Sequence, residues 1–464
     1  MREGIAIIIS LFSMTYMFAT NGDSLSKEVI TEQEYIEIIK QYHPLSLQAK
    51  NVRLEGESLV RSARGYFDPK LYAQHLDKNF ETKNYYDLTN IGLKIPTWFG
   101  VEVKSGWEYA FGSFTNPESS TPNDGLFYTG ISISPNQLII DKRKATLQKA
   151  KEYRKMSLHQ QNEMLNDLFR DAIYEYWNWS AQYEKMKILE VTLANINTRM
   201  INSRTLFKYG ELSTLDTLET STQLKAIQVE VLNSQLQYQK VTLNINNFLW
   251  GDNLIPMEVN DLKPEVINPN RFESSVEQQN VLLTKHPTLN AYQNKLEALK
   301  INQRLQAQNL APKLEFQYNV LRNGSRGLST SYSLNNYKWG FNFSFPILLR
   351  KERGQLQLAK IATQQQELKI KLKQQTLRTK ANSYLAMVKN LKKQQDTYQE
   401  AVTGYSKLLQ QEQRKVESGE STFFKLTIRE NKLYTSQLKY IDIQLKLIKS
   451  HLFYQHTIGQ LYSL

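Results

Sequence analysis

The chain has 464 residues, with 58 Lys and Arg against 45 Asp and Glu, a formal net charge of +13 and no Cys. Hydrophobic residues make up 41% and charged residues 22%, which is close to ordinary globular usage and excludes a wholly disordered chain, a collagen and a bundle of many membrane-spanning helices. The absence of Cys excludes a disulfide scaffold and a thiolate metal site, whereas the positive charge alone does not distinguish nucleic acid from an acidic membrane as partner.

The N-terminus has the pattern of a secretory signal peptide. Arg2 is followed by an apolar run from Gly4 to Ala19, and polar residues begin at Asn21. The run is shorter than the roughly 20 apolar residues of a membrane-spanning helix. We therefore assign residues 1–22 to a signal peptide and expect export of the mature chain, with an uncleaved anchor as the alternative and the cleavage position left open.

Four short motifs recur in the same order in the two halves of the chain. Two pairs are offset by 243 residues and two by about 210, so the first half holds about 32 extra residues between the second and third motifs. An ordered set of this kind predicts an internal duplication. The pairs are His43-Pro44 with His286-Pro287, Pro69-Lys70-Leu71 with Pro312-Lys313-Leu314, Ser134-Pro135 with Phe345-Pro346, and Tyr209-Gly210-Glu211 with Ser418-Gly419-Glu420. We divide the chain into a first repeat at 23–250, an equatorial linker at 251–271 and a second repeat at 272–464.

Each repeat is expected to open with helices. The motif Thr31-Glu32-Gln33-Glu34 fits a capping box. Helices are then predicted from about 43 to 64 and from about 287 to 309, and a proline ends each of them. His43 and His286 occupy equivalent helix starts, so we interpret them as capping or packing residues and not as metal ligands.

Strands follow in both repeats, at about 70–134 and 313–345. Apolar or aromatic residues alternate with small or polar ones, for example over eleven positions from Val101 to Phe111 and over seven from Leu314 to Val320. This suits strands of a transmembrane β-barrel, with a soluble sandwich as the alternative. The extra residues of the first repeat fall here and predict a hairpin at 91–112, which either widens a barrel to about eighteen strands or lies at its periplasmic rim.

Long helices are predicted next, over about 136–207 and 347–417. Apolar residues recur every seven positions, which predicts a coiled-coil seam. Each helix reverses at a glycine, Gly210 or Gly419, and returns over 214–249 or 423–462. The incoming and returning helices together roughly match one long helix in length. The seam residues are Leu165, Ala172, Trp179, Met186, Leu193 and Met200, and Ile370, Leu377, Tyr384, Leu391, Tyr398 and Tyr405.

No motif of a catalytic site occurs. The chain contains no phosphate-binding GxxxxGK loop, no HExxH and no GxSxG. His451 and His456 are five residues apart, which does not place them on one helix face as a pair of metal ligands. We therefore expect no enzyme activity, no cofactor and no bound metal.

Taken together, these motifs resemble the TolC-like outer-membrane efflux protein family over residues 28–464. The resemblance rests on the duplicated His-Pro helix, on Phe67-Asp68-Pro69-Lys70-Leu71, on Pro135 and Pro346, and on the two tip motifs. It implies an α+β fold in which long antiparallel coiled-coil helices form a periplasmic α-barrel and strands are pooled into a trimeric transmembrane β-barrel. It also implies a homotrimer in outer-membrane lipid that docks on a periplasmic membrane-fusion adaptor, and through it on an inner-membrane pump or ABC exporter, with no nucleic-acid partner.

The resemblance also indicates functional residues at the tips. The adaptor-docking residues would be Tyr209, Gly210, Glu211, Leu212 and Ser213 in the first tip, and Ser418, Gly419, Glu420, Ser421 and Thr422 in the second. A periplasmic gate would involve Asp216, Glu219 and Lys425. Related proteins carry acidic residues past the second tip, where this chain has Lys425 and Ile428, so Asp216 and Lys425 are predicted to pair between neighbouring helices.

The leading interpretation is an exit duct for a tripartite efflux pump or a type I secretion system. The alternative is a soluble periplasmic coiled-coil scaffold without channel activity. The sequence names neither the cargo nor the class of pump, and ion selectivity is not readable from net charge.

Overall fold

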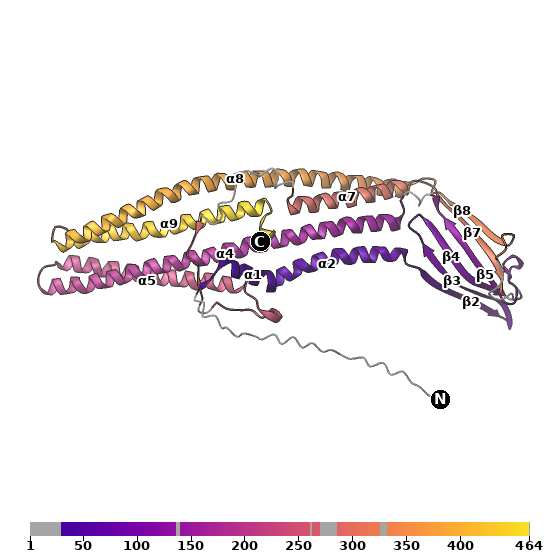
Figure 1. Ribbon diagram of the computed structural model, residues 1–464, viewed down its shortest axis with the longest axis horizontal. Helices are drawn as coiled ribbons and strands as arrows, with labels where there is room; N and C mark the ends of the chain where they lie inside the picture. The colour runs from indigo at the N-terminus through magenta and orange to yellow at the C-terminus, as the bar shows by residue number, and fades with distance from the viewer. Residues whose placement is uncertain (1–28, 136–139, 260–261, 270–284, 325–331, 464) are drawn as a thin grey trace, which may run out of the picture.

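The computed structural model describes residues 29–135, 140–259, 262–269, 285–324 and 332–463. The predicted signal peptide and parts of the predicted linker lie outside these residues. The molecule is elongated, with a layer of long helices at one end and a curled antiparallel sheet at the other (Figure 1). The predicted α+β class is therefore confirmed.

The sheet has six strands in the order β2-β3-β4-β5-β7-β8, and every neighbouring pair is antiparallel. The predicted extra hairpin is β3 and β4, which lie inside the sheet. β3 begins well before the expected residue 91 because it pairs with β2 along almost its whole length. The strands are β2 (Lys70–Phe80), β3 (Lys83–Pro96), β4 (Val101–Phe111), β5 (Leu126–Ile133), β7 (Lys313–Asn323) and β8 (Tyr337–Ser344).

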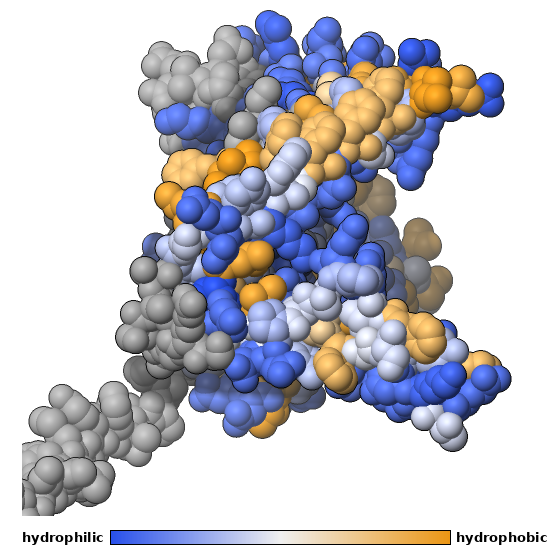
Figure 2. All heavy atoms as spheres, turned by 90° about the vertical axis from the view of Figure 1, so that its right-hand side faces the viewer, coloured by the Kyte–Doolittle hydropathy of each residue, from blue (hydrophilic) through white to orange (hydrophobic). Residues whose placement is uncertain are grey.

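The two faces of the sheet differ in polarity. One face exposes large apolar side chains, among them Leu71 at 78%, Trp339 at 66% and Phe343 at 60% exposure. The other face carries lysine, asparagine, glutamine and glycine at the alternate positions. Viewed from the sheet end, a band of hydrophobic residues crosses the top of the molecule, on the side where β7 and β8 lie (Figure 2).

The polar face is the concave one. Tyr72 of β2 and Tyr128 of β5 share a register row with Gly92 and Gly106 between them, and the two tyrosine hydroxyls contact each other. On a flat sheet they would stand about 14 Å apart. A Cβ built at either glycine would lie 2.6 Å from a tyrosine hydroxyl oxygen, so the glycines leave the space that the rings occupy and the sheet curls around them.

The helices form one layer. α4 runs through its middle, with α2 and α5 end to end on one side and α7 and α9 end to end on the other (Figure 1). α8 packs on α7 and α9, so it forms one edge of the layer, and α2 with α5 forms the other. The helices are α1 (Glu32–Tyr42), α2 (Pro44–Arg64), α4 (Lys142–Lys208), α5 (Thr214–Asn246), α7 (Pro287–Gln308), α8 (Arg350–Glu417) and α9 (Phe423–Thr457).

The core lies in the middle of this layer, where Phe169, Trp177 and Trp179 are almost completely buried. The predicted heptad seams are confirmed, since all twelve seam residues are buried or half-buried. Near the core, the two-residue strands β1 (Val29–Ile30) and β6 (Lys263–Pro264) pair in parallel and join the start of the chain to the segment between the repeats.

Several helix ends differ from the prediction. α8 begins at Arg350 instead of residue 347 because Leu349 has a φ of 49° and interrupts the helical backbone. α9 ends at Thr457 instead of residue 462 because Gly459, with a φ of 72°, turns the chain. A Cβ at Gly459 would lie 2.6 Å from Pro287 Cδ, so the C-terminal turn packs directly on the start of α7.

His43 and His286 are confirmed as capping residues. His43 Nδ1 accepts a hydrogen bond from the Leu45 amide at 3.1 Å, and His286 Nδ1 accepts one from the Thr288 amide at 3.2 Å. His43 also hydrogen-bonds the backbone of Asn247 at the end of α5. His286 does the same with Thr457, the last residue of α9. Each histidine therefore joins an incoming helix to the returning helix stacked on it.

The His286 cap predicts a pH dependence of stability. Burial, together with the nearby Lys373 and His456, lowers the pKa of His286 from 6.5 to about 4, although Asp167 opposes the shift. The unfolded chain then binds more protons than the folded chain between these values, so stability falls as the pH falls from 6.5 towards 4. In His286→Asn, a capping residue that does not titrate, we expect a weaker pH dependence of thermal unfolding followed by circular dichroism. An unchanged pH profile would contradict this role.

Candidate functional site

Two helical tips lie at the end of the molecule far from the sheet (Figure 1). Gly210 and Gly419 have φ values of 79° and 76°, and a Cβ at either would meet nothing within 4 Å. Their role is therefore to provide the left-handed backbone of the turn. Ser213 then caps α5, and the Thr422 side chain caps α9.

A groove of about 1110 Å³ separates the two tips. It brings together predicted residues of both repeats, with Glu211, Leu212 and Asp216 on one side and Gly419, Ser421 and Thr422 on the other. Tyr209, Gly210, Ser213, Ser418 and Glu420 belong to the turns beside the groove and do not line it, and neither do Glu219 and Lys425.

Apolar side chains are exposed around the tips. Tyr209 is 76% exposed, Leu215 73%, Leu218 62% and Phe424 50%. Exposed apolar residues gathered in one place commonly mark a surface that contacts another macromolecule. The tips therefore combine a groove with an apolar rim.

The predicted gate residues lie beside this groove. The Asp216 carboxylate accepts hydrogen bonds from the Ser213 hydroxyl at 2.6 Å and from the Ser213 amide at 3.3 Å. The Lys425 amide donates to the Thr422 hydroxyl at 3.4 Å. Asp216 thus caps its own helix, and its pairing with Lys425 of a neighbouring helix stays a prediction, as does the role of Glu219.

A buried polar cluster, two of whose residues (Arg199 and Glu430) line the groove, was not predicted. Arg199 of α4 forms an ion pair with Glu430 of α9 and donates to the Thr427 hydroxyl at 3.0 Å. Arg199 also contacts Gln223 of α5, which donates to Asn431 at 3.1 Å. Arg199 and Glu430 are 7% and 5% exposed. The cluster therefore joins the α4–α5 hairpin to α9 just above the tips.

Removing one partner of the Arg199–Glu430 ion pair should lower the free energy of unfolding. Glu430→Ala leaves the Arg199 charge buried without its counter-ion, so we expect a loss of about 3–5 kcal/mol in unfolding free energy. Replacing both residues by apolar ones of similar size should restore most of that loss. Thermal or denaturant unfolding followed by helical circular dichroism measures both variants.

The exposed pair Lys300–Glu297 supplies the control for this measurement. Lys300→Ala should change the unfolding free energy by less than about 1 kcal/mol. An equally small effect of Glu430→Ala would show that the buried cluster does not hold the hairpins together.

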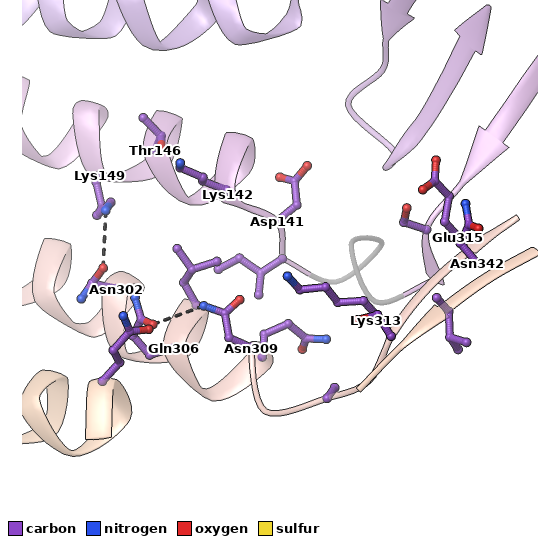
Figure 3. A pocket seen from close by; sticks show the side chains of 18 residues that line it. Asp141, Lys142, Thr146, Lys149, Asn302, Gln306, Asn309, Lys313, Glu315 and Asn342 are labelled. Atoms are coloured by element: carbon purple, nitrogen blue, oxygen red, sulfur yellow. Dashed lines mark hydrogen bonds between the residues drawn. The ribbon is translucent and has the colours of Figure 1, made fainter. Parts of the chain in front are cut away.

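A second cavity lies where the helices meet the sheet. It measures about 690 Å³, and its lining includes Asp141 and Lys142 at the start of α4, Asn302 of α7, and Lys313 and Glu315 of β7 (Figure 3). Among the described residues no group of three or more His, Asp and Glu is placed to hold a metal ion. The cavity instead continues the polar concave face of the sheet towards the helices.

The described helices include none that is both long and apolar enough to cross a membrane.

Comparison with known proteins gives a match to a family model over part of the chain and a shared fold over most of it. Residues 280–452 match the family model described as outer membrane efflux protein. No curated protein matches the chain.

Solved structures share the fold over nearly the whole chain. The Neisseria gonorrhoeae MtrE outer membrane channel in its open state is 13% identical, with a TM-score of 0.68 over 92% of this chain and 89% of that one. The outer membrane protein VceC of Vibrio cholerae is 12% identical, with a TM-score of 0.67 over 92% and 95%. The Campylobacter jejuni CmeC outer membrane channel is 14% identical, with a TM-score of 0.64 over 92% and 85%.

Proposed function

We propose that this chain belongs to the outer membrane efflux protein family, whose model matches residues 280–452, and that three copies of it form a continuous duct through the outer membrane and the periplasm. Proteins of this family are efflux channels of the outer membrane and not enzymes. The finer proposal is that the duct serves a tripartite efflux pump or a type I secretion system, with an adaptor bound at the tips.

The observation that carries the proposal is that each edge strand of the sheet is connected in the chain to a helix at an edge of the helical layer. The outermost strand β2 follows α2, which lies at one edge of the helical layer, and the other outermost strand, β8, precedes α8 at the opposite edge. A sheet edge with unpaired backbone groups is not tolerated in hydrocarbon. Pairing β8 of one copy with β2 of the next satisfies both edges, and the same rotation brings α8 against α2 and α5. Three copies give an eighteen-stranded barrel.

The helical edges carry apolar stripes that support this closure. On α5 the exposed residues Leu215, Val229, Leu236 and Leu243 are spaced by multiples of seven. On α8 the exposed residues include Leu358 and Leu372, also two heptads apart, and Ile361 and Leu368, one heptad apart. An apolar residue repeated every seven positions is the pattern of a helix that packs on a partner helix. The partner proposed for each stripe is the neighbouring copy of this chain.

The tips are proposed to dock on a periplasmic adaptor. The groove between them, its apolar rim and its position at the end opposite the sheet all support contact with a separate helical protein. An amphipathic helix laid into a groove is a common recognition mode. The inner-membrane pump or exporter would then contact this chain only indirectly.

The first test is purification from outer membranes in detergent, with the native mass and the single-channel conductance in a planar bilayer. We expect a trimer with discrete conductance steps, because closure of the sheet requires several copies. A soluble and non-conducting monomer or dimer would overturn the duct and favour a coiled-coil scaffold.

The second test separates docking from channel formation. Tyr209 is 76% exposed, so Tyr209→Glu should leave the trimer and its conductance intact. The same substitution should weaken export in cells by about tenfold or more, as expected for a residue at the centre of a contact. Val266→Glu, at a residue of the linker that is 70% exposed, is the matched control and should export normally. Normal export by Tyr209→Glu would argue against docking at this tip.

A further inference from the structure

We propose that the β-barrel lumen is a cationic, anion-selective passage, and that the cargo of the channel belongs to the class of anionic solutes, such as organic molecules with carboxylate or phosphate groups. This inference rests on the proposed function, because the concave face of the sheet becomes a lumen only when copies close the barrel. The lining itself is visible in the single chain.

A row of lysines crosses the concave face. Lys70 of β2 stands directly opposite Lys94 of β3, and Lys94 stands directly opposite Lys104 of β4. The same row continues through Gly130 and Asn319 to Lys338 of β8. Four of its six positions are therefore lysines, and three of these lie side by side.

Other contacts confirm that these lysines lie on the concave side. The Lys94 ammonium lies 4.9 Å from the centre of the Tyr72 ring, which is one of the two tyrosines that meet across the concave face. Lys338 lies 3.3 Å from Glu108 Oε2, although β8 and β4 are separated by two strands. Such a contact requires the sheet to curl towards the lysines.

The lysine row costs stability within the sheet. Like charges directly opposite each other on neighbouring strands destabilise a sheet, and here two such pairs share Lys94. In the described part of the chain, no carboxylate lies within 4 Å of the Lys70 or Lys94 ammonium. Two contacts offset part of this repulsion, because the Lys94 ammonium lies over the Tyr72 ring and Lys104 pairs with Glu102. A local arrangement that opposes folding is nevertheless expected at a functional site.

The whole concave face is positively charged. Up to the register shift at Lys78, it carries six lysines against three glutamates, a net charge of +3 for each copy. The glutamates are already engaged, because Glu102 pairs with Lys104 and Arg143, Glu108 with Lys338, and Glu315 accepts from the Ser132 hydroxyl. The six lysines are Lys70, Lys78, Lys94, Lys104, Lys313 and Lys338, and the glutamates are Glu102, Glu108 and Glu315.

Closure of the barrel concentrates this charge. Three copies bring three lysine rows around one aqueous lumen, and a passage lined by one sign of charge with walls of low dielectric raises the local concentration of the opposite ion. The lysines would therefore attract anions and repel cations at the membrane end of the duct. Up to the register shift at Lys78, the opposite face carries no lysine, and its charged residues are Arg322, Asp77 and Asp87.

The experiment measures the reversal potential of single channels in a potassium chloride gradient. The wild-type trimer should pass chloride in preference to potassium. The triple variant Lys70→Gln, Lys94→Gln, Lys104→Gln should lower the ratio of chloride to potassium permeability by about twofold or more. Lys83→Gln removes one charge at the first residue of β3, beside the β2–β3 turn, and should change the ratio less than the triple variant does.

Thermal unfolding of the trimer gives an independent readout. Because neutral side chains relieve the repulsion between opposed lysines, Lys94→Gln alone should raise the unfolding midpoint while it lowers the preference for chloride. A residue with only a structural role would lower the midpoint.

Each outcome decides the proposal. A conducting wild-type trimer that prefers potassium, or a triple variant with an unchanged permeability ratio, overturns the cationic passage and leaves the channel intact. The absence of any conductance from wild-type trimers overturns the channel itself, and the inference falls with it.

Discussion

Backbone hydrogen bonds at the two outer strands govern the architecture. Among the described residues of the single chain, β2 and β8 each have one side without a partner strand, and hydrocarbon offers no water to satisfy those groups. The requirement to pair them explains why the six-stranded sheet has an otherwise complete apolar face, and why the two edges of the helical layer end in exposed heptad residues. α2 precedes β2 and α8 follows β8 in the chain, whereas α5 lies end to end with α2, away from the sheet. In the proposed trimer, the rotation that relates neighbouring copies pairs the edge strands of the sheets and also brings the edges of the helical layers into contact.

The duplication is visible in how the helices are joined. In each repeat a histidine caps the incoming helix and hydrogen-bonds the end of the returning helix, so two short helices act as one long helix beside α4 or α8. The repeats differ in the sheet, where the first supplies four strands and the second two. They also differ in packing, because α4 contacts helices of both repeats whereas α8 lies at the edge. The central helix therefore carries the aromatic core, and the outer helix carries the exposed stripe.

Features set by local sequence could be predicted, and features set by long-range pairing could not. The capping histidines, the glycines of the tips, the heptad seams and the alternation of the strands each depend on residues close in sequence. The length of β3 could not be predicted because it depends on pairing with β2. The ion pair of Arg199 with Glu430 joins residues 231 apart, and its only sequence signal is a charged residue three positions after the buried Ile196. The lysine row emerges only when the registers of three strands are combined.

The tyrosine pair that spans Gly92 and Gly106 has a consequence for assembly. The ring contact and the missing Cβ atoms impose curvature on β2 to β5 inside one protomer, before any other copy is present. The sheet of each copy is therefore already curved before assembly. In the proposed barrel, the number of copies that closes the ring depends on this curvature as well as on the hydrogen bonding of the edge strands. Preset curvature also reduces the conformational freedom that must be lost when the ring closes. In the proposed barrel, the curvature set by these two glycines and two tyrosines contributes to the diameter of the lumen.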